Sequence, residues 1–393
     1  MTSRGSIALP RLFAAVTLAW LVTPVPAVAQ NAYITGSAGT DVIDTTTNSV
    51  SATITVGGFG VAVTSDGSKV YVTNGSGLSV INTATNSVSA TITVGNAPEG
   101  VAVTQDGSTV YVANLADGTV SVINTATNSV SATITGFSAP MGVAITPDGS
   151  KVYVTNSGGG GVSVIATASN TVIATMPTGS LPRGVAVSPD GKKVYVGFFR
   201  ELNPDQPPAD QIFLAYLGIY DTATNTAVQN IFLGGNFAGP GNDPANMPFG
   251  VAVTPDGSKV YVTSVSLTSC CVFAVDATTG GVATIFIPGL LAGVSVTPDG
   301  KKVYVAQLAD GAVSVIDTAT NNVTTIPNVG DSPSAFGIFI QPRFAGTAGS
   351  PKCQGTTFAV LTRQHGGLTA AATALGFTSV AALQNAVTAF CKV

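Results

Sequence analysis

Short runs of alternating apolar and small polar residues recur along most of the chain. Residues 142–156, GVAITPDGSKVYVTN, show the pattern: one alternating run, a Pro-Asp-Gly turn, and a second alternating run. Alternation with a period of two is typical of β-strands, and Asp-Gly permits a tight turn between antiparallel strands. Two further runs, such as VSVI and VSATI, follow and are joined by Thr-Ala-Thr-Asn. Each unit therefore predicts four short antiparallel strands.

The unit repeats about every 40 residues. Its second run contains a tyrosine in each of seven units: Tyr33, Tyr71, Tyr111, Tyr153, Tyr195, Tyr261 and Tyr304. The interval between Tyr195 and Tyr261 is longer because it contains insertions. Four short strands in about 40 residues make one blade of a β-propeller, and a blade buries both of its faces only by stacking on its neighbours.

The two ends of the chain set the number of blades. First strands are predicted to begin at seven glycines: Gly60, Gly100, Gly142, Gly184, Gly250, Gly293 and Gly337. The opening unit, residues 32–56, lacks a first strand, whereas residues 337–341 form a first strand with no unit after it. We therefore predict an all-β, seven-bladed β-propeller over residues 30–344, closed by pairing of its N- and C-terminal strands. An open solenoid would not need an extra strand at one end of the chain to match a missing strand at the other.

The recurring Tyr-Val-Thr-Asn, at residues 71–74 and 153–156, is preceded in the repeat by sequences such as Val-Thr-Pro-Asp-Gly. This combination resembles the YVTN-type propeller repeat, over residues 30–344. The resemblance implies relatives among exported bacterial propellers and archaeal surface-layer proteins. It implies a fold and no particular active site, because the members share blades and not a common catalytic centre. No blade ends in a Trp-Asp dipeptide, which argues against a WD-repeat propeller.

The predicted strand order places the connections on two opposite faces. Connections between strands one and two, and between three and four, are nearly uniform turns on one face. The other face carries the irregular connections, including two expected loops at residues 200–216 and 234–249. The first of these contains Arg200, Glu201 and Asp205 as candidate binding residues. Long loops in a regular array are often functional, although neutral drift in a tolerant loop would also explain them.

The irregular face is also expected to hold the mouth of the central channel. In each unit the residue before the first-strand glycine should lie near the axis, and only this position varies strongly: Phe59, Glu99, Met141, Arg183, Phe249, Ala292 and Phe336. A ring of mixed apolar and charged side chains suits a ligand or a peptide side chain. One alternative is that these side chains simply plug the channel. Another is that Glu99 and Arg183 only pair with each other, which would contribute little to stability if the pair is exposed.

Little in the propeller segment can support catalysis. The single histidine, His365, follows it, and the single tryptophan, Trp20, precedes it. Imidazole ligands for copper or haem, an imidazole base and the docking tryptophans of quinoprotein-type propellers are therefore all missing. We expect no cofactor and no metal site, because the aspartates lie in Asp-Gly turns that explain them. The enzymatic alternative is a lactonase-like hydrolase that uses Glu99, Glu201 or Asp205.

Residues 1–29 predict a cleavable signal peptide. Arg4 and Arg11 provide the positive start, residues 12–22 the short apolar core, and Ala-Val-Ala the cleavage site. An uncleaved anchor helix is disfavoured by Pro24 and Pro26. We expect a periplasmic or extracellular protein with no membrane span after cleavage. Only 9% of residues are charged, the net charge is −4 at pH 7, and no basic cluster occurs, so nucleic-acid binding is not expected.

The pattern changes from strands to helices after residue 344. Residues 345–352 are predicted to be a linker, and residues 353–393 a small helical module. Helices are expected over 357–365 and 368–375, and a third should begin after a capping Ser379 and end near Cys391.

Four cysteines in an exported chain should form disulfides. A bond between Cys353 and Cys391 would staple the helical module, which is too small to be stable without one. The adjacent Cys270 and Cys271 form either a vicinal disulfide or free thiols.

These features favour an exported scaffold, expected to be a monomer, that binds a protein, peptide or small ligand of the cell envelope through its irregular face. The second hypothesis is a structural component of the envelope or a surface layer, in which the low-charge surface packs against copies of itself. The third is the lactonase-like hydrolase.

Overall fold

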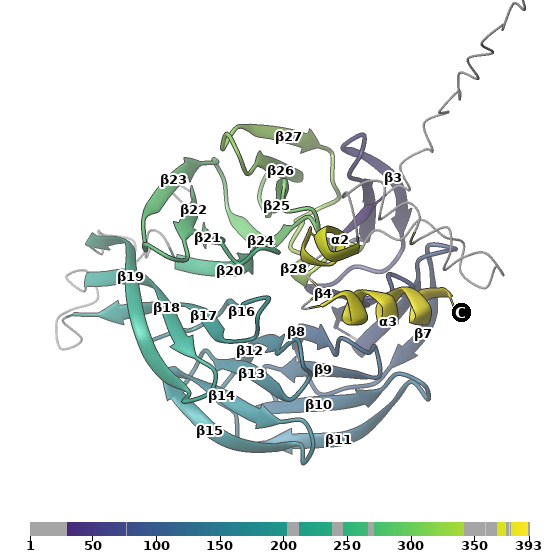
Figure 1. Ribbon diagram of the computed structural model, residues 1–393, viewed down its shortest axis with the longest axis horizontal. Helices are drawn as coiled ribbons and strands as arrows, with labels where there is room; N and C mark the ends of the chain where they lie inside the picture. The colour runs from purple at the N-terminus through teal and green to yellow at the C-terminus, as the bar shows by residue number, and fades with distance from the viewer. Residues whose placement is uncertain are drawn as a thin grey trace, which may run out of the picture.

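The computed structural model describes residues 30–75, 77–202, 212–237, 247–265, 271–341, 358, 368–374, 377 and 379–391. In this part of the chain, seven β-sheets stand as blades around a central axis (Figure 1). Five sheets have four strands, the first has three, and the second gains the last strand of the chain as a fifth. The predicted seven-bladed β-propeller is therefore confirmed.

The strands follow the chain from the axis to the rim of each blade. Blades one and two contain β1 (Asn31–Thr35), β2 (Thr40–Asp44), β3 (Ser49–Ile54), β4 (Gly60–Val63), β5 (Lys69–Asn74), β6 (Gly77–Asn82) and β7 (Ser87–Ile92). Blades three and four contain β8 (Pro98–Val103), β9 (Thr109–Asn114), β10 (Thr119–Asn124), β11 (Ser129–Thr135), β12 (Pro140–Ile145), β13 (Lys151–Asn156), β14 (Gly161–Ala166) and β15 (Thr171–Pro177).

Blade five has the longest strands, and the ring ends with a short closing strand. Blade five contains β16 (Val185–Val187), β17 (Lys193–Glu201), β18 (Ile212–Asp221) and β19 (Thr226–Phe237). Blades six and seven contain β20 (Met247–Val253), β21 (Lys259–Val265), β22 (Cys271–Asp276), β23 (Val282–Phe286), β24 (Leu291–Val296), β25 (Lys302–Gln307), β26 (Ala312–Asp317) and β27 (Val323–Pro327), and the closing strand is β28 (Phe336–Ile338).

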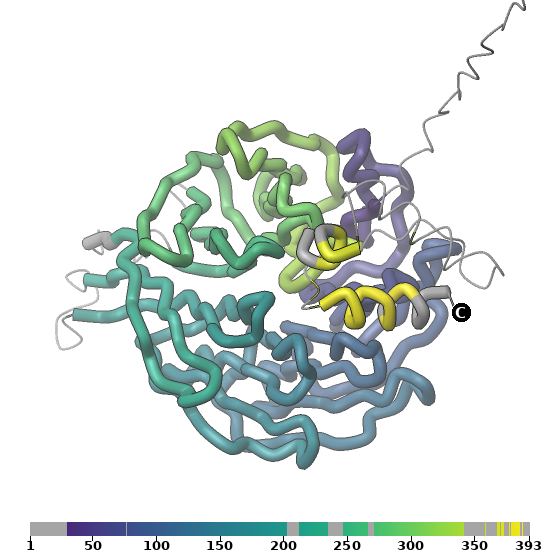
Figure 2. Tube along the Cα trace, viewed as in Figure 1, coloured from purple at the N-terminus to yellow at the C-terminus, as the bar shows by residue number. Residues whose placement is uncertain are grey.

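The ring closes where the two ends of the propeller meet. In Figure 2 the purple first blade lies beside the light-green end of the propeller. The backbone N–H of Tyr33 donates to the carbonyl oxygen of Phe339 at 2.8 Å, and the N–H of Gln341 donates to the carbonyl of Asn31 at 2.8 Å. An antiparallel bridge joins Ala32 to Ile340. The segment after β28 thus supplies the missing inner strand of blade one, as predicted, while β28 itself runs parallel to β4.

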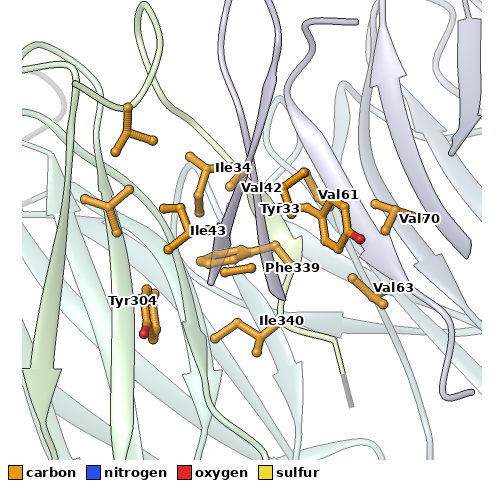
Figure 3. Close-up of a cluster of buried hydrophobic side chains, with 14 of the residues drawn as sticks. Tyr33, Ile34, Val42, Ile43, Val61, Val63, Val70, Tyr304, Phe339 and Ile340 are labelled. Atoms are coloured by element: carbon orange, nitrogen blue, oxygen red, sulfur yellow. The ribbon is translucent and has the colours of Figure 1, made fainter. Parts of the chain in front are cut away.

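A buried apolar cluster fills the closure. Tyr33, Ile34 and Val42 from blade one contact Phe339 and Ile340 from the end of the propeller, and all five are at most 2% exposed (Figure 3). The same cluster includes residues of blades two and seven, so it joins three blades. Closure therefore buries side chains as well as pairing backbone groups.

The repeat tyrosine packs between blades. All seven tyrosines at this position are almost fully buried. In three blades the hydroxyl donates to an asparagine in the turn between strands three and four of the next blade, as Tyr111 does to Asn170 at 2.9 Å and Tyr304 to Asn48 at 2.6 Å. Those asparagines have positive φ, a conformation that asparagine tolerates better than most residues. The Tyr of the motif and the Asn of the turn thus form one inter-blade contact.

The repeat threonine and glycine fix the inner strands. Thr155 Oγ1 accepts a hydrogen bond from the N–H of Gly142 at 2.7 Å and donates to the carbonyl of Arg183 in the next blade at 2.9 Å. Thr73 and Thr263 make the same pair of bonds in their blades. A Cβ on Gly142 would overlap the carbonyl oxygen of Arg183, so this position needs glycine for the close approach.

The connections lie on two faces, as predicted. On one, here called the turn face, the turns between strands one and two contact those between strands three and four; the N–H of Thr83 donates to the carbonyl of Ser68, for example. On the other, called the loop face, connections between strands two and three contact those that enter the blade, as the N–H of Leu115 bonds the carbonyl of Ala97. The turn face is nearly identical from blade to blade, whereas the loop face is not.

The described residues after the propeller include the helices α2 (Leu368–Ala374) and α3 (Val380–Cys391). Ser379 caps α3 as predicted, because its hydroxyl accepts a hydrogen bond from the N–H of Ala382 at 3.1 Å. Ala371 and Ala372 pack against Leu383 and Val387 in a small core. Most of the helix expected over 357–365, and residues 345–352, lie outside the described residues.

Candidate functional site

The seven variable residues gather at the axis on the loop face. Each lies directly before the inner-strand glycine of its blade. Repeat threonines bind the backbone carbonyls of this position, as Thr73 binds that of Glu99 and Thr155 that of Arg183. In ring order from blade one they are Phe336, Phe59, Glu99, Met141, Arg183, Phe249 and Ala292. We call this set the mouth. Repeat threonines hold its backbone in the same way in several blades while its side chains differ, so the mouth is one varied ring on a repetitive scaffold.

One half of the mouth is aromatic. The rings of Phe249 and Phe336 meet edge to face with centroids 5.4 Å apart, and Phe59 contacts both at 5.9 and 5.6 Å. Ala292 lies between Phe249 and Phe336 in ring order, and its small side chain leaves room for that contact. Met141 belongs to the same buried cluster. These side chains close the mouth, which is the plugged arrangement named above as one alternative.

The other half of the mouth carries two opposite charges. Burial raises the pKa of the Glu99 carboxyl to about 7, and the positive charge of Arg183 opposes this only partly. Burial also lowers the pKa of the Arg183 guanidinium. The guanidinium carbon of Arg183 lies 5.3 Å from the centre of the Phe249 ring, within the range of a cation–π contact.

Glu99 and Arg183 interact electrostatically, but no hydrogen bond between them is present among the described residues. Glu99 Oε2 and Arg183 Nε are both buried and have no hydrogen-bond partner among the described residues. No hydrogen bond or ion pair joins the two side chains in the described part of the chain, so the direct pairing considered from the sequence is not formed. They lie two blades apart, with Met141 between them in ring order.

The channel beneath the mouth is narrow. It contains a cavity of about 20 Å³. The cavity is lined by Phe336 and by inner-strand residues of several blades, among them Gly100, Val143, Gly184 and Gly250. That volume accommodates about one water molecule, far less than an organic ligand needs. No carboxylate is among the lining residues. A ligand would therefore bind at the mouth or on the loop face, and not within the channel.

The insertion in blade five is more ordered than the sequence suggested. Residues 200–216 were expected to form a loop, but Arg200 and Glu201 belong to β17 and pair with Leu214 and Phe213 of β18. The alternation of the blade continues into the insertion, which lengthens the hairpin. The expected loop at 234–249 is likewise partly strand, because β19 continues to Phe237 and β20 begins at Met247. Asp205 lies outside the described residues.

The lengthened hairpin carries an aromatic row that the sequence analysis missed. Phe198, Tyr216 and Phe232 lie on adjacent strands of blade five, with ring centroids 5.8 and 5.7 Å apart. Phe198 is buried, whereas Phe232 is 53% exposed. Leu202, at the end of this hairpin, and Leu181, in the connection that enters blade five, are also exposed. The sequence could have predicted this row only from the pairing of aromatic residues across neighbouring strands. That pairing becomes apparent only when part of the insertion is assigned to strands.

The remaining candidate side chains are the possible metal ligands and the cysteines. Among the described residues, no group of three or more His, Cys, Asp or Glu side chains could hold a metal ion. Cys271 begins β22 and is buried. Cys270 and Cys353 lie outside the described residues, so neither expected disulfide is tested there. In the same described part of the chain, no helix is long and apolar enough to cross a membrane.

No protein-family model matches the chain, and no curated protein matches it in sequence. Solved structures share its fold. A chain of the hydrazine synthase of Kuenenia stuttgartiensis superposes with a TM-score of 0.62 at 22% identity, over 71% of this chain and 88% of that one. A putative 6-phosphogluconolactonase from Bacteroides uniformis gives 0.59 at 18% identity, over 80% of this chain and 99% of that one. At these identities the likeness establishes the class, a seven-bladed β-propeller, and says nothing of the chemistry.

Proposed function

We propose that this protein is an exported YVTN-type propeller that recognises a protein, peptide or small ligand of the cell envelope through its loop face. The observation that carries the proposal is the difference between the two faces of one ring. The turn face repeats the same hydrogen-bonded turns from blade to blade, whereas the loop face combines the mouth with the lengthened hairpin of blade five. Variation restricted to one face of a rigid scaffold is typical of a binding surface.

Exposed apolar side chains near the hairpin support this proposal. Leu181, Leu202 and Phe232 are 38, 50 and 53% exposed. Aromatic and aliphatic side chains held on strands make rigid contacts at little cost in conformational entropy. Arg200 at the same hairpin adds an exposed positive charge.

Replacing the hairpin tip tests the proposal. In one variant, residues 202–211 are replaced by the short connection Leu115–Gly118 of blade three, which joins the same two strands of its blade. We expect wild-type protein to retain a specific partner from an envelope fraction and the variant to lose it, with unchanged circular dichroism and unfolding midpoint. Retention of the same partner by the folded variant would contradict a role for the hairpin.

The supporting expectations about export belong to this proposal. Cleavage after residue 29 would release a periplasmic or extracellular protein, and a Cys353–Cys391 bond would staple α3 to the preceding segment. Mass spectrometry of the purified protein, before and after reduction and alkylation, tests both at once. An intact N-terminus, or alkylation of Cys353 or Cys391 without prior reduction, would contradict them.

The two alternative functions, a structural role and a hydrolase, rest on different observations. A structural role in the envelope draws on the outer strands of all seven blades, which contain no charged residue and leave their edges unpaired within the described sheets. Sedimentation at high concentration tests it, because a strictly monomeric species would count against it.

A lactonase-like hydrolase draws on Glu99, whose pKa of about 7 suits a general base. No second carboxylate of the described residues accompanies it at the mouth.

A further inference from the structure

The two unpartnered atoms of the mouth have complementary chemistry. Glu99 Oε2 is a hydrogen-bond acceptor when the carboxyl is ionised, and Arg183 Nε carries a hydrogen that it can only donate. Both are buried, and neither has a partner among the described residues. Buried polar atoms are almost always hydrogen-bonded, because an unmet donor or acceptor is costly. A guest that donates to one and accepts from the other would satisfy both.

The charges of the mouth restrict what that guest can be. A cation attracted to Glu99 would meet the guanidinium of Arg183, and an anion attracted to Arg183 would meet Glu99. The electrostatic coupling between these two side chains shows that each lies within the field of the other. An uncharged group avoids both repulsions. Among uncharged groups, a primary carboxamide presents a donor and an acceptor side by side.

The surroundings favour an apolar group next to the carboxamide. Met141 lies between Glu99 and Arg183 in ring order, and the Phe249 ring lies against the Arg183 guanidinium. Phe59 is only partly buried, unlike Phe249 and Phe336, so it is the ring whose displacement would admit a guest from the loop face. The aromatic half would then cover the apolar part of the ligand.

We propose that the mouth binds an uncharged primary carboxamide between Glu99 and Arg183, with the adjoining apolar part of the ligand against Met141 and the phenylalanine rings. This inference rests on the proposed binding function of the loop face and names the chemistry that its mouth recognises. The carboxamide belongs either to a free small molecule or to a glutamine or asparagine side chain of a peptide.

Three probes of similar size and different charge test the proposal with the mature full-length chain. Benzamide, benzoate and benzylammonium are titrated by calorimetry and by ligand-observed NMR. We expect benzamide to bind in the millimolar range and the two charged probes to bind at least about tenfold more weakly. An N-acetyl glutaminyl-phenylalanine dipeptide then separates the sources, because tighter binding than benzamide indicates a peptide and weaker binding a small molecule.

Two substitutions and a matched control locate the binding. Glu99→Met and Arg183→Met place in blades three and five the residue that blade four already carries at the same position, Met141, so both are expected to fold. Each should weaken benzamide at least about tenfold, by removing one hydrogen bond. Lys301→Met on the turn face should leave it unchanged. Equal binding of the three probes, no binding of benzamide, or undiminished binding by both mouth variants would overturn the proposal.

The outcomes separate this inference from the proposed function. If benzamide fails to bind while the hairpin replacement still abolishes capture of an envelope partner, the mouth chemistry is wrong and the loop-face function stands. If benzamide binds as expected and the hairpin replacement has no effect, recognition depends on the mouth and not on the hairpin.

Discussion

The backbone N–H of Tyr33, in the first strand of the propeller, donates to the carbonyl oxygen of Phe339, just after the last strand, at 2.8 Å. Both residues are fully buried in the cluster that joins blades one, two and seven. A ring with no such closure would leave blade one with an open inner edge and blade seven without a neighbour. The stability of the whole propeller therefore depends on a few residues near its C-terminal end.

Phe339→Ala should destabilise the protein strongly. Removing a fully buried phenylalanine ring costs about 3–5 kcal/mol, through lost burial and the cavity left behind. Ile338→Ala is the matched control, because this neighbouring side chain is 69% exposed and its removal should cost less than about 0.5 kcal/mol. Urea unfolding measures the difference in unfolding free energy between the two variants, from their midpoints, provided that their m-values are equal. Equal midpoints would mean that the closing segment does not hold the ring together.

Gly142→Ala tests the close approach of neighbouring inner strands. The added Cβ would overlap the carbonyl oxygen of Arg183, which the hydroxyl of Thr155 already holds in place. We expect a loss of about 1–3 kcal/mol in unfolding free energy, as for other overpacked sites. Gly75→Ala is the control, because a Cβ there meets nothing within 4 Å. If thermal melts find the two alanine variants equally stable, glycine is not required at the inner strand.

Glu99 should make stability depend on pH in an unusual direction. Burial raises its folded-state pKa to about 7, above the ordinary value of 4.5, so the folded protein holds this proton more tightly than the unfolded chain. Its contribution to stability is therefore present below about pH 4.5 and is lost as the pH rises to about 7. The unfolding free energy of wild type minus that of Glu99→Gln should fall by roughly 2 kcal/mol between pH 5 and pH 8. A difference independent of pH would mean that Glu99 is solvated like a surface carboxylate.

The sequence predicted the ring well because the repeat determines it locally. Tyr111, Thr155 and Gly142 each make a contact with the next blade, and the same residue types recur wherever that contact is needed. The first unit lacks a strand and the end of the propeller has one to spare, so the two ends were predicted to pair and close the ring. Non-repeated positions were harder to predict, because the pairing of Arg200 with Leu214 depends on the strand register across an insertion that the repeat does not determine.

The sequence placed the variable positions near the axis and left open whether they form a binding rim or plug the channel. Position alone placed Phe59, Phe249 and Phe336 near the axis, but their mutual contact depends on the small Ala292 between two of them. The absence of a hydrogen bond between Glu99 and Arg183 is equally hard to predict, since the two residues belong to blades three and five with blade four between them. Such distances follow from the diameter of the ring, which no local pattern in the sequence encodes.

Site-specific photo-crosslinking tests the central claim, recognition through the loop face, most directly. A photoreactive amino acid is placed at Leu181 on the loop face and, in a second protein, at Lys301 on the turn face, both of which are exposed. After irradiation with the envelope fraction, we predict a discrete crosslinked partner from position 181 and none from position 301. The same partner from both positions, or a partner from position 301 alone, would contradict the account.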